Sequence, residues 1–99
     1  MDYLYVFYKD HTRNSEILRK VVQHADGIDD ARRKGVRLDR HHRFDSRHRI
    51  DSRLIKVYIR TEMRDVYVGS ILCQGGHLWY TAKGNTYEIK DNGELGSKW

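Results

Sequence analysis

The chain has 99 residues, of which 38% are hydrophobic and 33% are charged, and its formal net charge is +5. This length predicts one small domain with a single core, and the composition excludes a disordered chain. The longest apolar run is too short to span a bilayer, and Asp2 argues against a secretory signal. Cys73 is the sole cysteine, so no internal disulfide can form. We therefore expect a cytoplasmic protein without membrane contact or cofactor.

The positive charge is concentrated in one segment. Residues 32–53 contain nine Lys or Arg and three Asp, which makes this window +6 and leaves −1 for the remaining residues. His41, His42 and His48 lie in the same segment and add charge below about pH 6.5. A basic segment of this kind is typical of surfaces that contact phosphates or acidic proteins.

The N-terminal third predicts one strand followed by one helix. Residues 3–8 are aromatic or β-branched throughout, which favours a central strand. Asn14 or Ser15 can cap a helix, and the apolar residues that follow recur at helical spacing: Ile17, Leu18, Val21, Val22 and Ala25. The spacing predicts the main helix here, with its end at Gly27. A second, short helix is predicted from Asp29 to residue 34, ended by Gly35.

Residues 38–53 form an imperfect six-residue repeat. Each unit starts with an apolar residue, at Leu38, Phe44 and Ile50, and continues with Asp and a polar or basic stretch. An even period keeps the three apolar residues on one face only if the segment is extended, since a helix rotates successive members by about 240°. We therefore predict a basic extended arm over residues 36–53. A tandem duplication in the coding sequence would produce the same repeat without any function.

The C-terminal half predicts an antiparallel meander. Apolar and polar residues alternate in four segments separated by turn residues: 54–60, 66–73, 78–82 and 86–90. Gly69 and Ser70 suggest a bulge, and the pairs Gly75-Gly76 and Gly84-Asn85 suggest turns. The predicted fold is α+β, in β-α-β-β-β-β order, with a four- to five-stranded antiparallel sheet, one packed helix and the basic arm. The predicted domain covers residues 1–90, and residues 91–99 form a polar tail.

The arm is the strongest functional signal, because Arg matches phosphates bidentately. We predict a non-enzymatic protein that binds nucleic acid or a nucleoprotein, or an acidic protein surface of a complex that processes nucleic acid. The predicted binding residues are Arg37, Arg40, His41, His42, Arg43, Arg47, His48, Arg49 and Arg53. Aromatic side chains of the sheet would supply stacking faces if they are exposed, namely Tyr58, Tyr67, Trp79 and Tyr87.

Two other functions remain open. A phage or mobile-element inhibitor that blocks a host defence complex would have the same composition, rich in Tyr and Arg. A small ribonuclease toxin would use His41, His42 and His48 beside several Arg as general base, general acid and phosphate clamp, although catalytic groups need fixed positions. Cys73 and His77 have half of a zinc motif, but without a second pair we predict no metal site. An exposed sheet face or edge strand would also allow a homodimer.

Overall fold

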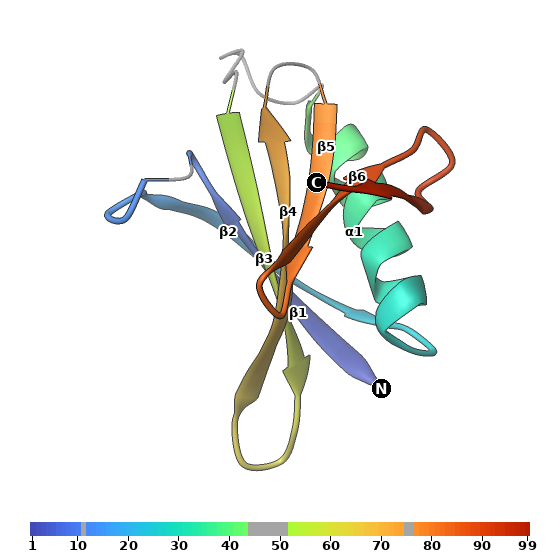
Figure 1. Ribbon diagram of the computed structural model, residues 1–99. Coiled ribbons are helices and arrows are strands. Elements are labelled where there is room, and N and C mark those ends of the chain that lie inside the picture. Colours follow the sequence, from blue (N-terminus) through green and yellow to red (C-terminus); the bar gives the residue numbers. More distant parts are fainter. Residues whose placement is uncertain (11, 44–51, 75–76) are drawn as a thin grey trace.

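The computed structural model describes residues 1–10, 12–43, 52–74 and 77–99, with the backbone alone at residues 41–43 and 52. One α-helix packs against one side of a strongly coiled antiparallel sheet (Figure 1). The fold is α+β, as predicted, but the sheet has seven strands rather than four or five. The elements follow in the order β1 Asp2–Tyr8, β2 Ile17–His24, α1 Ile28–Arg43, β3 Ser52–Arg60, β4 Asp65–Gln74, β5 His77–Ala82, β6 Asn85–Ile89 and β7 Leu95–Lys98.

The strands lie in the order β2-β1-β3-β4-β5-β6-β7, and every neighbouring pair is antiparallel. β1 is therefore an inner strand, as its aromatic and β-branched residues predict. Strands β3 to β7 form a meander, and the β1–β2 hairpin joins that meander through the pairing of β1 with β3. No helix in the described ranges is both long and apolar enough to cross a membrane.

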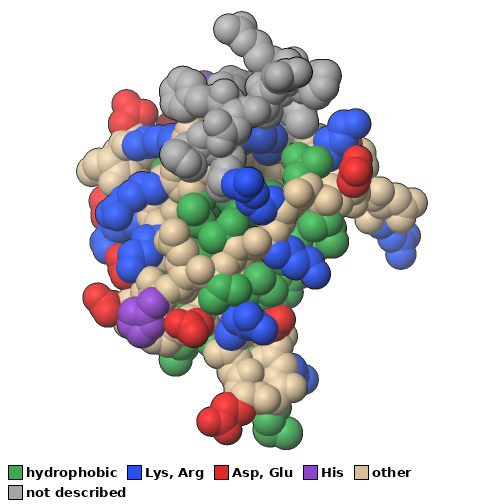
Figure 2. Space-filling model, turned by 180° about the vertical axis from the view of Figure 1, so that it is seen from behind, with side chains coloured by type: hydrophobic (Ala, Val, Ile, Leu, Met, Phe, Trp, Pro, Cys, Tyr) green, Lys and Arg blue, Asp and Glu red, His purple; other side chains and the backbone are tan. Residues whose placement is uncertain are grey.

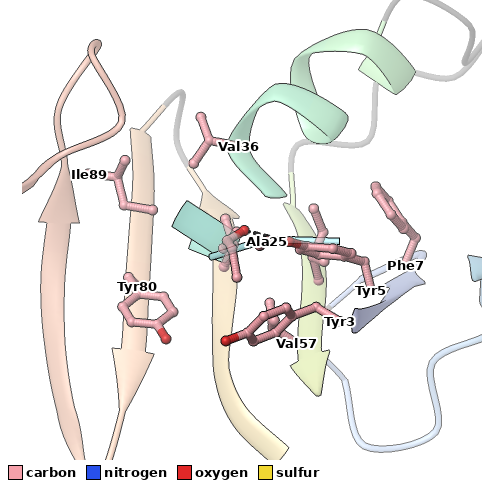
Figure 3. Close-up of a cluster of buried hydrophobic side chains, with 11 residues drawn as sticks. Tyr3, Tyr5, Phe7, Ala25, Val36, Val57, Tyr80 and Ile89 are labelled. Atoms are coloured by element: carbon pink, nitrogen blue, oxygen red, sulfur yellow. Dashed lines mark hydrogen bonds between the residues drawn. The ribbon is translucent and has the colours of Figure 1, made fainter. Parts of the chain in front are cut away.

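The core lies between α1 and one face of the sheet (Figure 3). Tyr3, Tyr5 and Phe7 alternate along β1 and point to this face, where the Tyr5 hydroxyl donates to the carbonyl oxygen of Ala31 at 2.6 Å. The helix approaches closely at Gly35, because a Cβ built there would lie 2.6 Å from Cδ1 of Ile71. Aromatic rings thus fill a thin core, and a glycine lets α1 reach the sheet.

The prediction of a helix over residues 15–26 is wrong, because this segment forms β2. Three of its apolar residues, Ile17, Leu18 and Val22, are 45–52% exposed, and only Val21 packs against the core. β2 is an edge strand, and within the described residues it pairs with β1 alone. Its first four residues are exposed on both faces, so this half lacks the polar–apolar alternation of a half-buried strand and its spacing fitted a helix by chance.

The helix of the fold is instead α1, which extends the short helix predicted from Asp29 through Gly35 to Arg43. The residues of α1 that face the sheet recur at helical spacing, but several are not apolar: Ala31, Arg32, Gly35, Val36 and Asp39 are all buried. The extended arm is therefore wrong for residues 36–43, which are helical, and residues 52–53 begin β3. Residues 44–51, including Phe44 and Ile50, lie outside the described residues.

The C-terminal segment is not a loose tail, because β7 pairs with β6. Arg33 forms an ion pair with Glu94 in the loop that precedes β7, and Arg32 donates to the carbonyl oxygen of Gly93 at 3.3 Å. Gly93 has a φ of +88°, a conformation that favours glycine. These contacts with α1 stabilise β7, a polar strand that its own sequence does not predict.

Two predicted turn features are shifted by one residue. The register of β3 with β4 leaves Val68 as the extra residue of a bulge, next to the predicted Gly69-Ser70. The β5–β6 hairpin turns at Lys83-Gly84, with φ values of 51° and 78°, and Asn85 begins β6. Two residues of positive φ suit the twist of a tight hairpin. The predicted Gly75-Gly76 turn lies outside the described residues.

Candidate functional site

The face of the sheet opposite α1 is uncovered by any helix among the described residues, and we call it the open face. Because side chains alternate along a strand, the residues that precede and follow each core residue in its strand point to this face. The strand registers arrange the open face in three rows. They are Tyr8–Leu54–Leu72–Trp79, Lys20–Val6–Lys56–Ser70–Thr81 and Val22–Leu4–Tyr58–Tyr67.

Aromatic side chains form two groups on the open face. In the first, the rings of Tyr58 and Tyr67 meet edge to face with centroids 5.7 Å apart. The Tyr67 hydroxyl lies 2.5 Å from that of Ser70, which fixes the exposed ring of Tyr67 on β4. The amine of Lys56 lies 5.1 Å from the ring centroid of Tyr8, a cation–π contact that links the neighbouring strands β1 and β3.

The second group lies toward the other end of the sheet. The ring centroid of Trp79 is 6.1 Å from that of Trp99 and 6.5 Å from that of His77. Trp99 follows β7, and its backbone N–H donates to the carbonyl oxygen of Thr86 at 2.7 Å, yet the residue is 89% exposed. An exposed indole held by the backbone offers an apolar, planar surface to a partner.

The middle of the open face is positive, because the charged side chains within the three rows are Lys20 and Lys56. Carboxylates lie at the margins of this face: Glu88 follows Trp79 in the first row, and beyond the third row are Asp2 and Asp65, of which Asp65 forms an ion pair with Arg60. Burial, the largest cause, and the neighbouring Tyr8 raise the pKa of Tyr58 above its ordinary value of 10.0. The phenol therefore stays neutral at physiological pH and adds no negative charge. The open face combines aromatic rings, aliphatic side chains and amines.

The predicted basic residues fall into three groups. Arg37 and Arg40 are exposed on α1, and Arg40 donates to the carbonyl oxygen of Asp91 at 2.6 Å. The backbone of His41, His42 and Arg43 forms the last turn of α1, and their side chains are not described; Arg47, His48 and Arg49 lie outside the described residues. Because α1 covers the opposite face, Arg37 and Arg40 are not brought together with the aromatic rows.

Arg53 is part of an internal ion pair. Its guanidinium donates to both carboxylate oxygens of Asp39 at 3.1 Å, and its Nη2 lies 3.4 Å from Sγ of Cys73. The side chains of Arg53 and Asp39 are only 15% and 5% exposed. This pair joins α1 to β3 and holds Arg53 away from solvent, so we leave Arg53 out of the proposed interface.

A cleft of about 410 Å³ lies between the end of α1 and strands β5 and β6. Its two cations, Arg40 and Lys90, face three carboxylates, those of Asp39, Glu88 and Asp91. A polyanion gains little from such a lining. Among the residues that the structure describes, no three potential metal ligands gather, and Cys73 of the half zinc motif is buried.

Three of the four aromatic residues proposed for stacking lie on the open face: Tyr58, Tyr67 and Trp79. Tyr87 pairs with the core residue Tyr80 and points to the other face. The sequence analysis missed Tyr8 and Lys56, which occupy alternate positions that become neighbours only through the β1–β3 register. It also missed Trp99, because the segment that carries it was predicted to be a tail.

Comparisons of the chain with models of protein families, with curated proteins and with solved structures gave no match. The argument for function therefore depends on the geometry of the open face.

Proposed function

We propose that this protein binds single-stranded nucleic acid across the open face of its sheet. The observation that carries the proposal is the set of aromatic rings with two amines in the middle of this face, where the carboxylates of Asp2, Asp65 and Glu88 lie only at the margins. Each nucleobase has a planar face that stacks on an aromatic ring, and alanine substitution of such a ring typically costs about 1–3 kcal/mol per base. Amines beside the rings attract the phosphates of the same strand.

The geometry favours an unpaired strand over a duplex. The bases of a duplex stack on each other and present only their edges in the grooves, so an aromatic side chain on a sheet cannot reach their faces. A single strand exposes its bases, and a sheet presents rows of side chains on neighbouring strands about 4.8 Å apart. The open face therefore suits several successive bases, with little dependence on sequence.

The test is a titration of short single- and double-stranded RNA and DNA over a salt series, followed by fluorescence anisotropy. We expect single strands to bind more tightly than duplexes, with affinity that falls as salt rises. Replacing Tyr67 by Ala removes an exposed ring and should weaken binding roughly tenfold, whereas Tyr67→Phe keeps the ring and should preserve most of the affinity. Equal losses in the two variants would contradict stacking.

The predicted basic segment is tested separately. Replacing Arg43, Arg47 and Arg49 by Ala removes three charges and should reduce both affinity and salt dependence if these residues contact phosphates. If this variant binds like the wild-type protein while Tyr67→Ala does not, the open face alone is the site. If both variants leave binding unchanged, nucleic acid is not the ligand of either surface.

A further inference from the structure

Among the described residues, the outer edge of β2 has no partner strand. Because β2 pairs with β1 on one side, alternate backbone N–H and C=O groups along its other side are available to an incoming chain, except the carbonyl oxygen of His24, which accepts from Nζ of Lys34 at 2.7 Å. β2 has eight residues, twice as many as β7 at the opposite edge of the sheet. Ile17, Leu18 and Val22 are exposed along it.

The register defines the usable length of this edge. Tyr8 pairs with Ile17 and Phe7 with Arg19, so Leu18 is the extra residue of a bulge. A bulge interrupts regular pairing and bends the strand, and an incoming strand should therefore end beside it. Arg19 to His24 remain as six regular positions, enough for a short extended segment.

The positive charge of the β2 edge indicates which kind of strand would pair with it. Arg19 and Lys20 are neighbours in sequence, exposed, and point to opposite faces of the sheet. Seen from behind, the molecule shows basic, acidic and hydrophobic side chains interspersed on its surface (Figure 2). In an antiparallel pair with a second copy, Arg19 and Lys20 would face His24 and Gln23 and gain no opposite charge, whereas carboxylates opposite Arg19 and Lys20 would form cross-strand pairs on both faces.

From this we infer that β2 is a docking edge for an extended acidic segment of a partner protein, which adds as an eighth, antiparallel strand. The segment would place carboxylates opposite Arg19 and Lys20 and β-branched residues opposite Val21 and Val22. Backbone hydrogen bonds would supply the affinity, and the alternating side chains the specificity. This inference does not depend on nucleic-acid binding by the open face.

The probe is the capped peptide Thr-Thr-Val-Ile-Glu-Glu, whose antiparallel register puts its two Glu opposite Lys20 and Arg19. In an NMR titration we expect amide shifts of residues 19–24. The matched peptide that ends in Lys-Lys should bind roughly tenfold more weakly, because two favourable cross-strand pairs become repulsive. N-methylation of one alternate set of peptide amides should abolish binding, and N-methylation of the other set should leave it unchanged, because only one set faces β2.

The reciprocal change is made in the protein. Arg19→Glu with Lys20→Glu should reverse the preference, so that the Lys-Lys peptide binds better than the Glu-Glu peptide. Failure of both peptides to shift residues 19–24, or binding that is insensitive to N-methylation, would overturn the inference. A wild-type dimer that Val22→Lys dissociates would also overturn it, since the edge would then serve self-association.

Discussion

The substitution Gly35→Ala would measure how closely α1 packs against β4. Replacing this glycine by Ala should stabilise the helix by about 1 kcal/mol through helix propensity alone. The new Cβ, however, would lie 2.6 Å from Cδ1 of Ile71 and 3.0 Å from the ring of Tyr5. Ile71 is only 1% exposed, so its methyl group has no free space into which to move. Overpacking of this kind costs about 1–3 kcal/mol, and we expect the free energy of unfolding to fall by about 1 kcal/mol net.

A double-mutant cycle in urea separates the two effects. Ile71→Val removes the methyl group that Cβ would meet and by itself costs about 1 kcal/mol. Combined with Gly35→Ala it should cost less than the sum of the single changes, with a coupling of about 1 kcal/mol. Arg37→Gly, at an exposed position of the same helix, gives the propensity effect directly. If Gly35→Ala stabilises the protein by the full propensity effect, without coupling to Ile71→Val, the close approach of α1 to β4 is refuted.

Three further changes test other contacts. Gly69→Ala places a Cβ against the ring of a buried tyrosine on β5 and should lower the free energy of unfolding by about 1–3 kcal/mol in urea titrations; an unchanged value would contradict this contact. Asp39→Ala leaves the guanidinium of Arg53 buried without its carboxylate and should cost about 3–5 kcal/mol, whereas Asp39→Leu combined with Arg53→Met should recover most of that loss; equal losses would argue against an ion pair. The Arg33 guanidinium lowers the pKa of Glu94 below its ordinary value of 4.5, so folding favours the ionised carboxylate. The stabilisation that the ionised Glu94 gives to the folded state is complete above pH 4.5 and is lost as the pH falls through the lower pKa of the folded state. The difference in the free energy of unfolding between wild type and Glu94→Gln should therefore shrink from pH 7 to pH 3 in denaturation curves.

The sequence predicted the strands correctly where buried side chains recur at every second residue. The aromatic run of β1 and the alternation in β3 and β5 identified their strands, because each of these strands has one face on the core. α1 was largely missed because Arg32, Gly35 and Asp39 occupy part of its buried stripe. The guanidinium of Arg32 can be buried against the sheet because it pairs with Asp29 and Glu94, and the pairing with Glu94 exists only in the folded protein.

The candidate site was predictable in part for the same reason. Tyr58, Tyr67 and Trp79 are alternate residues of strands that the sequence identified, so their place on a sheet face followed from the strand period. The cluster of basic residues misled the sequence analysis, because linear proximity in residues 32–53 concealed distinct roles. Arg32 and Arg53 are buried in ion pairs, and Arg37 is exposed on the helix.

The single seam between β1 and β3 has a consequence for the kinetics of folding. It pairs Tyr3 with Ile59 and Tyr8 with Leu54, residues roughly fifty positions apart, whereas every other strand pairing joins consecutive strands. The β1–β2 hairpin can form from local contacts within microseconds, and the β3–β7 meander is a series of such hairpins. Closing the seam requires a large loss of chain entropy before the core around Tyr5 is complete. Docking of the hairpin onto the meander should therefore limit the folding rate, and substitutions in the seam should slow refolding more than those in the β5–β6 hairpin.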